Sequence, residues 1–186
     1  MLHSLMLISP LSAEAQAALS EIIEEKPYKR NTHLLKIGGV SHYMYFVNEG
    51  VARVYYEVNG LDVTDYFAID GQFIGGVDSL FSGRPSKKGI QLLEDSTVLR
   101  VNYRQFEELC TRHHDIERVG RKMAIFAFLE GQQRIESIRF HEAKERYEVL
   151  NQKYPGLINR CPLKYIASYL GITQVSLSRI RASAAQ

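Results

Sequence analysis

Residues 163–180 read Leu-Lys-Tyr-Ile-Ala-Ser-Tyr-Leu-Gly-Ile-Thr-Gln-Val-Ser-Leu-Ser-Arg-Ile, and this stretch decides the fold of the C-terminal part of the chain. Ala167 is small enough to let two helices cross, and Gly171 tolerates the positive φ that a tight turn between them requires. Thr173 is a good N-cap for a second helix beginning at Gln174. Apolar side chains recur where the two helices would pack together: Ile166, Leu170, Ile172, Leu177 and Ile180. The stretch therefore predicts a helix-turn-helix.

The start of the second helix is expected to face outward with Gln174, Val175, Ser176, Ser178 and Arg179. In a helix-turn-helix this part of the second helix reaches base edges in the major groove. Arg179 suits a bidentate contact with guanine, Gln174 suits adenine, and Val175 suits the thymine methyl group. A further set suits contacts with phosphates: Lys164, Arg181 and the hydroxyls of Thr173 and Ser176. An ordinary helical hairpin is the alternative interpretation of the same pattern.

The charge of the chain is unevenly distributed. Residues 1–110 carry 10 basic and 14 acidic side chains, whereas residues 141–186 carry 7 basic and 3 acidic ones. A basic C-terminal part is typical of a segment that meets a polyanion. The charge distribution therefore favours double-stranded DNA as the partner of the predicted helix-turn-helix.

The middle of the chain, residues 28–101, predicts an antiparallel β-roll. Short runs rich in Val, Ile, Tyr and Phe are separated by glycine-containing turns at intervals typical of a sandwich or barrel. Asn59-Gly60 is the strongest hairpin signal among these turns. The residues before the roll are expected to form a helix over 12–25 that begins at Ser12 and ends before Pro27.

Helical periodicity returns after the roll, first over residues 102–109 and then over 115–140. The longer stretch lacks proline, and the run Ala-Ile-Phe-Ala-Phe-Leu at 124–129 is apolar nearly all round. We therefore expect this helix to be buried on two faces, shared between the β-roll and a second subunit, rather than to be an internal core helix. The predicted dimer contacts are Val119, Met123 and Phe126.

Composition excludes several classes of protein. The 186 residues are 45% hydrophobic and 24% charged, as in an ordinary globular protein. No stretch approaches the roughly 20 apolar residues of a membrane span. Cys110 and Cys161 are too few for a disulfide framework or a four-thiolate metal site, and they are expected to be reduced thiols in a cytoplasmic protein.

A β-roll, a long helix and a C-terminal helix-turn-helix, in this order, resemble the Crp/Fnr family of transcription regulators. The most specific matching segments are Gly71-Gln-Phe-Ile-Gly75 and the run at 166–181. The resemblance implies an α+β fold with a cyclic-nucleotide-binding-like sensor domain over 1–112, a dimerisation helix over 113–140, and a winged helix-turn-helix over 141–186. It also implies a homodimer, double-stranded DNA as partner, and RNA polymerase as a further candidate partner.

The wing of that domain has little sequence from which to form. Only residues 182–186 follow the predicted recognition helix. The two strands of a wing are therefore expected before the helix-turn-helix instead, around Arg160-Cys-Pro.

The ligand site departs from what the resemblance implies. Relatives that bind cyclic AMP carry a glutamate after the second glycine of the turn and an Arg-Ser or Arg-Thr pair further on, whereas this chain has Gly76 and Ser86-Lys87 there. Lysine cannot reproduce the planar grip of arginine on a phosphate, which disfavours ordinary cyclic AMP binding. Another small anionic effector, or none, is the remaining expectation. The candidate pocket comprises Phe73, Ile74, Gly75, Gly76, Val77, Asp78, Arg84, Ser86, Lys87 and Lys88.

No pattern of an enzyme stands out. The chain lacks a Gly-x-Ser-x-Gly elbow and a phosphate-binding Gly-x-x-x-x-Gly-Lys, and His42 and Glu49 lack the second histidine of a cupin-like metal site. We therefore expect no catalytic residues and no metal, and the sequence identifies no cofactor with certainty. The predicted function is a sequence-specific DNA-binding transcription regulator. The alternative is a ligand-sensing module that acts on a protein partner without binding DNA.

Overall fold

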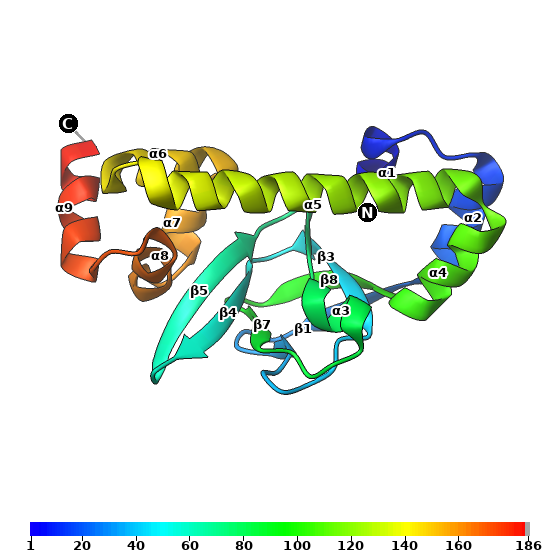
Figure 1. Cartoon of the computed structure of the whole chain (residues 1–186), viewed down its shortest axis with the longest axis horizontal. Coiled ribbons are helices and arrows are strands. Elements are labelled where there is room, and N and C mark those ends of the chain that lie inside the picture. Colours follow the sequence, from blue (N-terminus) through cyan, green and yellow to red (C-terminus); the bar gives the residue numbers. More distant parts are fainter. Residues whose placement is uncertain (185–186) are drawn as a thin grey trace.

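The computed structural model describes residues 1–184 as a β-roll, one long helix along it, and helices at both ends of that helix (Figure 1). The helices are α1 Leu2–Ile8, α2 Ala13–Ile22, α3 Val77–Ser82, α4 Tyr103–Arg112, α5 His114–Phe140, α6 Ala143–Lys153, α7 Leu157–Arg160, α8 Leu163–Leu170 and α9 Gln174–Ala184. The strands are β1 Ile23–Tyr28, β2 His33–Leu35, β3 Tyr43–Glu49, β4 Ala52–Val58, β5 Leu61–Ala68, β6 Gln72–Ile74, β7 Lys88–Leu92 and β8 Ser96–Asn102. The mixed α+β architecture predicted from the sequence is confirmed.

Two four-stranded sheets form the roll. Sheet A has the order β1-β8-β3-β6, sheet B has the order β2-β7-β4-β5, and every pairing is antiparallel. Inward side chains of both sheets make the core of the roll, among them Val47, Val54, Ile90 and Val98, which are at most 1% exposed. β5 lies at an edge of sheet B, so one side of its backbone is free of strand partners.

The hairpin of β4 and β5 turns at the predicted dipeptide. Asn59 has φ 52° and Gly60 has φ 77°, and Val58 pairs directly with Leu61. Positive φ at both central residues is what a two-residue type I′ hairpin turn requires. The sequence signal at Asn59-Gly60 is therefore confirmed.

The helix predicted over residues 12–25 is confirmed at its start, and its predicted end was wrong. Ser12 is the N-cap of α2, since its Oγ accepts a hydrogen bond from the Ala15 amide at 3.2 Å, but the chain enters β1 at Ile23. Pro27 lies inside β1 and pairs with Thr97 of β8. Because β1 is an edge strand, proline fits there without removing a ladder hydrogen bond. α1 was not predicted.

α5 runs along the whole molecule (Figure 1), and its two halves have different surroundings. Ile116 and Val119, in the first half, are at most 1% exposed in a core with α1, α2 and α4. Every residue from Ala124 to Glu130 is exposed. The expectation that this run is buried on two faces is therefore not met within one subunit.

The C-terminal head, residues 141–184, consists of α6 to α9 and packs on the outer face of sheet B. Its core includes Leu150, Leu157 and Ile166 of the head together with Val51 and Phe67 of the roll. In the part of the chain that the structure describes, no strand follows β8. The prediction of wing strands around Arg160-Cys-Pro was wrong, because Arg160 ends α7 and Pro162 is the N-cap of α8. Residues 182–184 continue α9, and residues 185–186, also considered for the wing, lie outside the described residues.

None of the helices within residues 1–184 is long and apolar enough to cross a lipid bilayer.

Candidate nucleic-acid interface and ligand pocket

The turn between α8 and α9 has the geometry expected of a helix-turn-helix. Gly171 has φ 65°, and its amide donates to the carbonyls of Ala167 and Ser168. A Cβ at this position would meet nothing within 4 Å, so backbone conformation rather than space favours glycine here. The Ile172 amide donates to the Ala167 carbonyl at 3.0 Å, which closes the turn.

The two helices pack through the apolar side chains that the sequence singled out. Ile166, Ala167, Leu170 and Leu177 are at most 2% exposed, and Ile172 and Ile180 pack against them. Thr173 caps α9, since its Oγ1 accepts a hydrogen bond from the Ser176 amide at 3.1 Å. Packing and capping together fix the direction in which α9 leaves the turn.

The predicted base-reading face of α9 is exposed. Val175 has 62% of its surface exposed, and Gln174, Ser178 and Arg179 are exposed as well. Ser176 is half-buried, and its hydroxyl lies 3.0 Å from that of Thr173.

Three basic side chains accompany this face. Lys164 is exposed beside the ring of Tyr165, with its Nζ 4.7 Å from the ring centroid. Arg179 is exposed and Arg181 is half-buried. Within residues 1–184 none of the three forms an ion pair with a carboxylate. The face therefore combines uncompensated positive charge with exposed hydrogen-bonding groups.

The candidate ligand loop follows β6 and is closed by its own hydroxyl groups. The Ser79 Oγ donates to the Arg84 carbonyl at 2.6 Å and accepts from the Ser41 amide at 2.9 Å. Ser86 is 5% exposed, and its Oγ donates to the Lys88 carbonyl at 2.8 Å and accepts from the Lys88 amide at 3.1 Å. The Ser86 hydroxyl is therefore already committed to the loop's own backbone.

Gly76 is the residue that the resemblance matched with a ligand-binding glutamate, and its surroundings leave little space for a side chain. A Cβ on Gly76 would lie 2.5 Å from Leu35 Cδ2 and 3.4 Å from Ser41 Cβ. Leu35 is 6% exposed in the core of the roll. A larger side chain at this position therefore has to displace a core leucine.

Side chains of β5 lie beside this loop, and the sequence analysis did not identify them. The Tyr66 hydroxyl donates to the Gly75 carbonyl at 3.0 Å, and burial raises the pKa of Tyr66 to about 12. The Asp65 carboxylate, 10% exposed, binds Lys88 Nζ at 2.6 Å and Arg134 of α5 at 2.8 Å. The Arg134 guanidinium also donates to the Asp65 carbonyl at 2.6 Å. The Lys88 ammonium is therefore paired within the chain, with a carboxylate that it shares with Arg134.

The other predicted pocket residues are dispersed. Ile74 is 3% exposed in the core, and Phe73 packs edge-to-face on Phe46 at 4.9 Å between ring centroids. Val77 and Asp78 are exposed on the first turn of α3. Arg84 and Lys87 are exposed. The structure thus brings Gly75, Ser86 and Lys88 together around β5 and leaves the two other basic side chains in solvent.

The predicted dimer residues fall on different sides of α5. Val119 is 1% exposed in the core with α1, α2 and α4, and Met123 packs against the same core. Phe126 is 50% exposed. Val119 is therefore corrected to an internal core residue, because the N-terminal helices already cover that side of α5. Met123 is half-buried, and its role as a dimer contact stays a prediction. Exposed apolar side chains continue along the helix: Ile125, Phe126, Phe128, Leu129, Ile135, Ile138 and Phe140.

Neither cysteine is placed for metal chemistry. Cys110 is half-buried, Cys161 is buried, and burial raises the pKa of the Cys161 thiol to about 12. Within the described chain, no three His, Cys, Asp or Glu side chains gather closely enough to hold a metal ion.

Comparison with known proteins places this geometry in a recognised class of folds. Residues 25–113 match the cyclic nucleotide-binding domain family. FixK2 from Bradyrhizobium japonicum superposes with a TM-score of 0.74 at 18% identity, covering 87% of this chain and 84% of that one. A regulator of the crp/fnr family from Eubacterium rectale gives a TM-score of 0.70 at 15% identity, covering 94% and 83%. The catabolite activator protein of Thermus thermophilus gives 0.58 at 19% identity, covering 96% and 86%. No curated protein matches the sequence.

Proposed function

Since the chain carries a cyclic nucleotide-binding domain within the fold of Crp/Fnr transcription regulators, we propose that it is a sequence-specific, dimeric DNA-binding regulator of that type. The observation that carries the proposal is the face of α9. Gln174, Val175, Ser178 and Arg179 are exposed at the N-terminal end of the second helix of a helix-turn-helix, where base contacts are made. The alternative, a module that acts on a protein partner alone, gives no reason for this exposed set.

The second half of α5 supports a homodimer. Phe128 is 65% exposed, Ile138 is 58% exposed and Phe140 is 76% exposed, on a helix that also exposes Ile125 and Leu129. An apolar helix surface of this length is costly in water, and pairing with the same helix of a second copy would bury it. A two-fold dimer presents two copies of α9, so the DNA site is expected to be a palindrome with half-sites about one helical turn apart.

The pocket supports a regulator that does not respond to cyclic AMP in the ordinary way. The Ser86 hydroxyl is engaged by the Lys88 backbone, the Lys88 ammonium is engaged by Asp65, and Gly76 has no room for a carboxylate side chain. A cyclic phosphate would have to compete with Asp65 for the Lys88 ammonium, and the two other basic side chains of the loop, Arg84 and Lys87, lie in solvent. Another anionic effector, or none, remains the expectation.

Selection of DNA sites from a random duplex library by the purified full chain tests the proposal. We expect enrichment of a palindrome without added nucleotide, and no change in affinity or in thermal unfolding with cyclic AMP or cyclic GMP. A clear stabilisation by either nucleotide would contradict the proposed pocket. Failure to enrich any sequence, with or without nucleotide, would favour the protein-partner alternative.

A further inference from the structure

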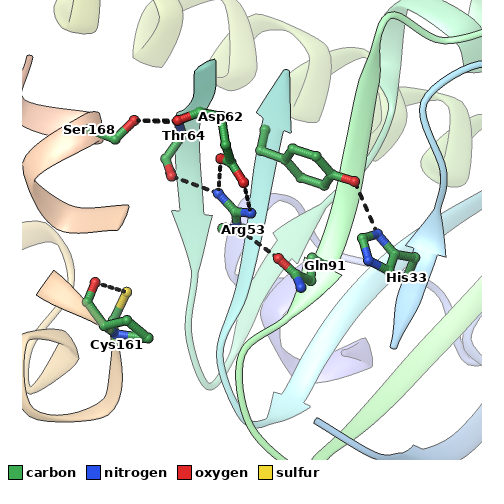
Figure 2. A network of polar contacts seen from close by, with 9 residues as sticks. His33, Arg53, Asp62, Thr64, Gln91, Cys161 and Ser168 are labelled. Carbon is green, nitrogen blue, oxygen red and sulfur yellow. Dashed lines mark hydrogen bonds and ion pairs between the residues drawn. The ribbon is translucent and has the colours of Figure 1, made fainter. Parts of the chain in front are cut away.

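Arg53 of β4 is the most deeply buried charged side chain in the roll, and it lies under the head rather than in the ligand pocket (Figure 2). The residue is 2% exposed. Its guanidinium donates to both carboxylate oxygens of Asp62 at 2.5 and 2.6 Å, to Thr64 Oγ1 at 3.1 Å and to Gln91 Oε1 at 3.0 Å. A buried arginine is tolerated only when its charge and its donors are satisfied, and here roll residues meet that condition.

The flat face of the Arg53 guanidinium is stacked on an aromatic ring of the head. The ring centroid of Tyr165, on α8, lies 3.6 Å from Arg53 Cζ, and the ring of Tyr55 lies 4.5 Å away. Arginine stacks on aromatic faces through its planar, weakly hydrated guanidinium, and lysine does not reproduce this arrangement. Arg53 therefore ties the sheet to the first helix of the helix-turn-helix.

Ser168, one turn further along α8, bonds directly to the free edge of β5. Its Oγ accepts a hydrogen bond from the Thr64 amide at 2.9 Å and donates to the Asp62 carbonyl at 3.3 Å (Figure 2). These two backbone groups lie on the side of β5 that has no strand partner. The Ser168 hydroxyl thus satisfies one donor and one acceptor of the sheet edge. The two residues that provide these backbone groups, Asp62 and Thr64, also bind Arg53 through their side chains.

Apolar packing and ion pairs extend the same contact. Phe67 of β5 packs against Tyr154 at 5.8 Å and Tyr169 at 5.5 Å between ring centroids. Arg160 of the head bonds both Asp70 and Glu94 of the roll, the latter at 2.5 Å. The head is therefore held on the roll by contacts from α7, α8 and the end of α6, and α9 follows α8 through the Gly171 turn.

We propose that Arg53, Tyr165 and Ser168 form a latch that positions the DNA-reading helix by locking α8 onto the sheet of the same subunit. This inference rests on the proposed function for its DNA-binding consequence. With the latch closed, the exposed face of α9 is held at one orientation to α5 without any effector. Arg53 and Ser168 contact neither the exposed residues of α9 nor the ligand loop, so they act on DNA binding through position alone; Tyr165 also lies beside Lys164, a predicted phosphate contact.

Amide hydrogen exchange and DNA binding of the full chain test the latch together. The variants are Ser168→Ala, which removes both edge hydrogen bonds, and Arg53→Lys, which keeps the charge but loses the stacked, two-pronged contact. We expect exchange of the Thr64 amide to rise about tenfold in Ser168→Ala, because two hydrogen bonds of modest net strength are lost. Affinity for the DNA site selected by the wild type is expected to fall in both variants, with the preferred sequence unchanged.

Matched controls come from exposed positions. Ser183→Ala removes a hydroxyl on α9 that donates to the Ile180 carbonyl at 2.8 Å, and Arg104→Lys alters an exposed arginine on α4. Both controls are expected to match the wild type in exchange at β5. Circular dichroism on each variant establishes that it is folded, and Ser168→Ala alone carries the test if Arg53→Lys is not folded.

The outcomes separate the structural claim, that the latch holds α8 on the sheet, from the functional claim, that the latch positions α9 for DNA binding. Unchanged protection of Thr64 in Ser168→Ala would overturn the latch. Lost protection with unchanged DNA affinity in both variants would overturn its positioning role. If the wild type selects no DNA at all, the proposed function fails, and the exchange comparison still supports or overturns the docked head.

Discussion

Arg179 is exposed on the first turns of α9 and, among residues 1–184, has no carboxylate partner. We predict that Arg179→Ala weakens binding to the selected DNA site by about 1–3 kcal/mol, with the loss concentrated at one base pair, because a bidentate contact with guanine is removed. Competition binding with single-base variants of the site measures this. Ser183→Ala is the control on the same helix. A uniform loss at every position would instead make Arg179 a phosphate contact.

Gly76 gives a second prediction at the scale of one residue. We expect Gly76→Glu to destabilise the chain by about 1–3 kcal/mol, because the new Cβ lies 2.5 Å from Leu35 Cδ2 and the core must give way. The glutamate is also expected to confer no binding of cyclic AMP. Denaturant unfolding and calorimetric titration measure the two effects.

The neighbouring glycine provides the control for Gly76. A Cβ at Gly75 would meet nothing within 4 Å, so Gly75→Ala should leave stability nearly unchanged. Nucleotide binding by Gly76→Glu at wild-type stability would contradict our account of the pocket.

Among the elements, α5 has the most distinctive surface. We predict that Phe126→Glu and Phe128→Glu produce folded monomers, since both side chains are at least 50% exposed in one subunit and are expected to be buried between two. Light scattering and circular dichroism measure mass and fold. Met123→Glu is the contrasting variant, because Met123 packs in the core with α1, α2 and α4 and its loss should unfold that end. Persistent dimers in both phenylalanine variants would place the interface elsewhere.

Sequence predicts the elements of this chain where local chemistry decides them. The Asn59-Gly60 hairpin, the Ser12 cap and the Thr173-capped helix after Gly171 all depend on residues within one turn, and all three are confirmed. β1 was missed because Glu-Glu-Lys-Pro carries no strand signal, and its pairing with β8 is decided some 70 residues later along the chain. The hydrophobic pattern also does not distinguish an apolar run that is buried within one subunit from a run that is buried only between two subunits.

The residues of the candidate site also separate into those that local sequence predicts and those that depend on contacts between distant segments. Exposure of the reading face of α9 follows from helical periodicity, so its residues could be predicted from sequence. The partners of Lys88 and of the head could not. Asp65 meets Lys88 and Arg134 only when β5, β7 and α5 pack together, and Arg53 meets Tyr165 only when α8 packs on sheet B. An aspartate and an arginine inside otherwise apolar strands were the available signals, and they do not say what they contact.

At the scale of the whole molecule, head and roll are joined by groups that titrate. The hydrogen bond from Arg160 holds the pKa of Asp70 below its ordinary value of 3.8. A carboxyl whose pKa is lower when folded contributes stability above pH 3.8, and this contribution is lost as the pH falls through the lower, folded value. We predict that the head loosens from the roll below about pH 3.8, as measured by exchange at β5 across a pH series corrected for intrinsic rates.

Asp70→Asn provides the comparison for that series. The variant should have a weaker contact between head and roll at neutral pH and a flatter response to acid, since Arg160 then keeps only Glu94 as a charged partner. An acid response identical to that of the wild type would show that other carboxyl groups control the loosening.

The free edge of β5 also bears on how this protein stays in solution. An unpaired strand edge beside apolar side chains is a template on which other chains add strand by strand, and proteins protect such edges with helices, charges or bulges. Here α8 is the cover: it supplies Ser168 to the edge backbone and keeps Phe67 at 2% exposure. Proteolytic loss of the head would therefore do more than remove the proposed DNA-binding surface. It would expose the unpaired backbone edge of β5 and the side chain of Phe67, and the remaining β-roll would be prone to fibrous self-association.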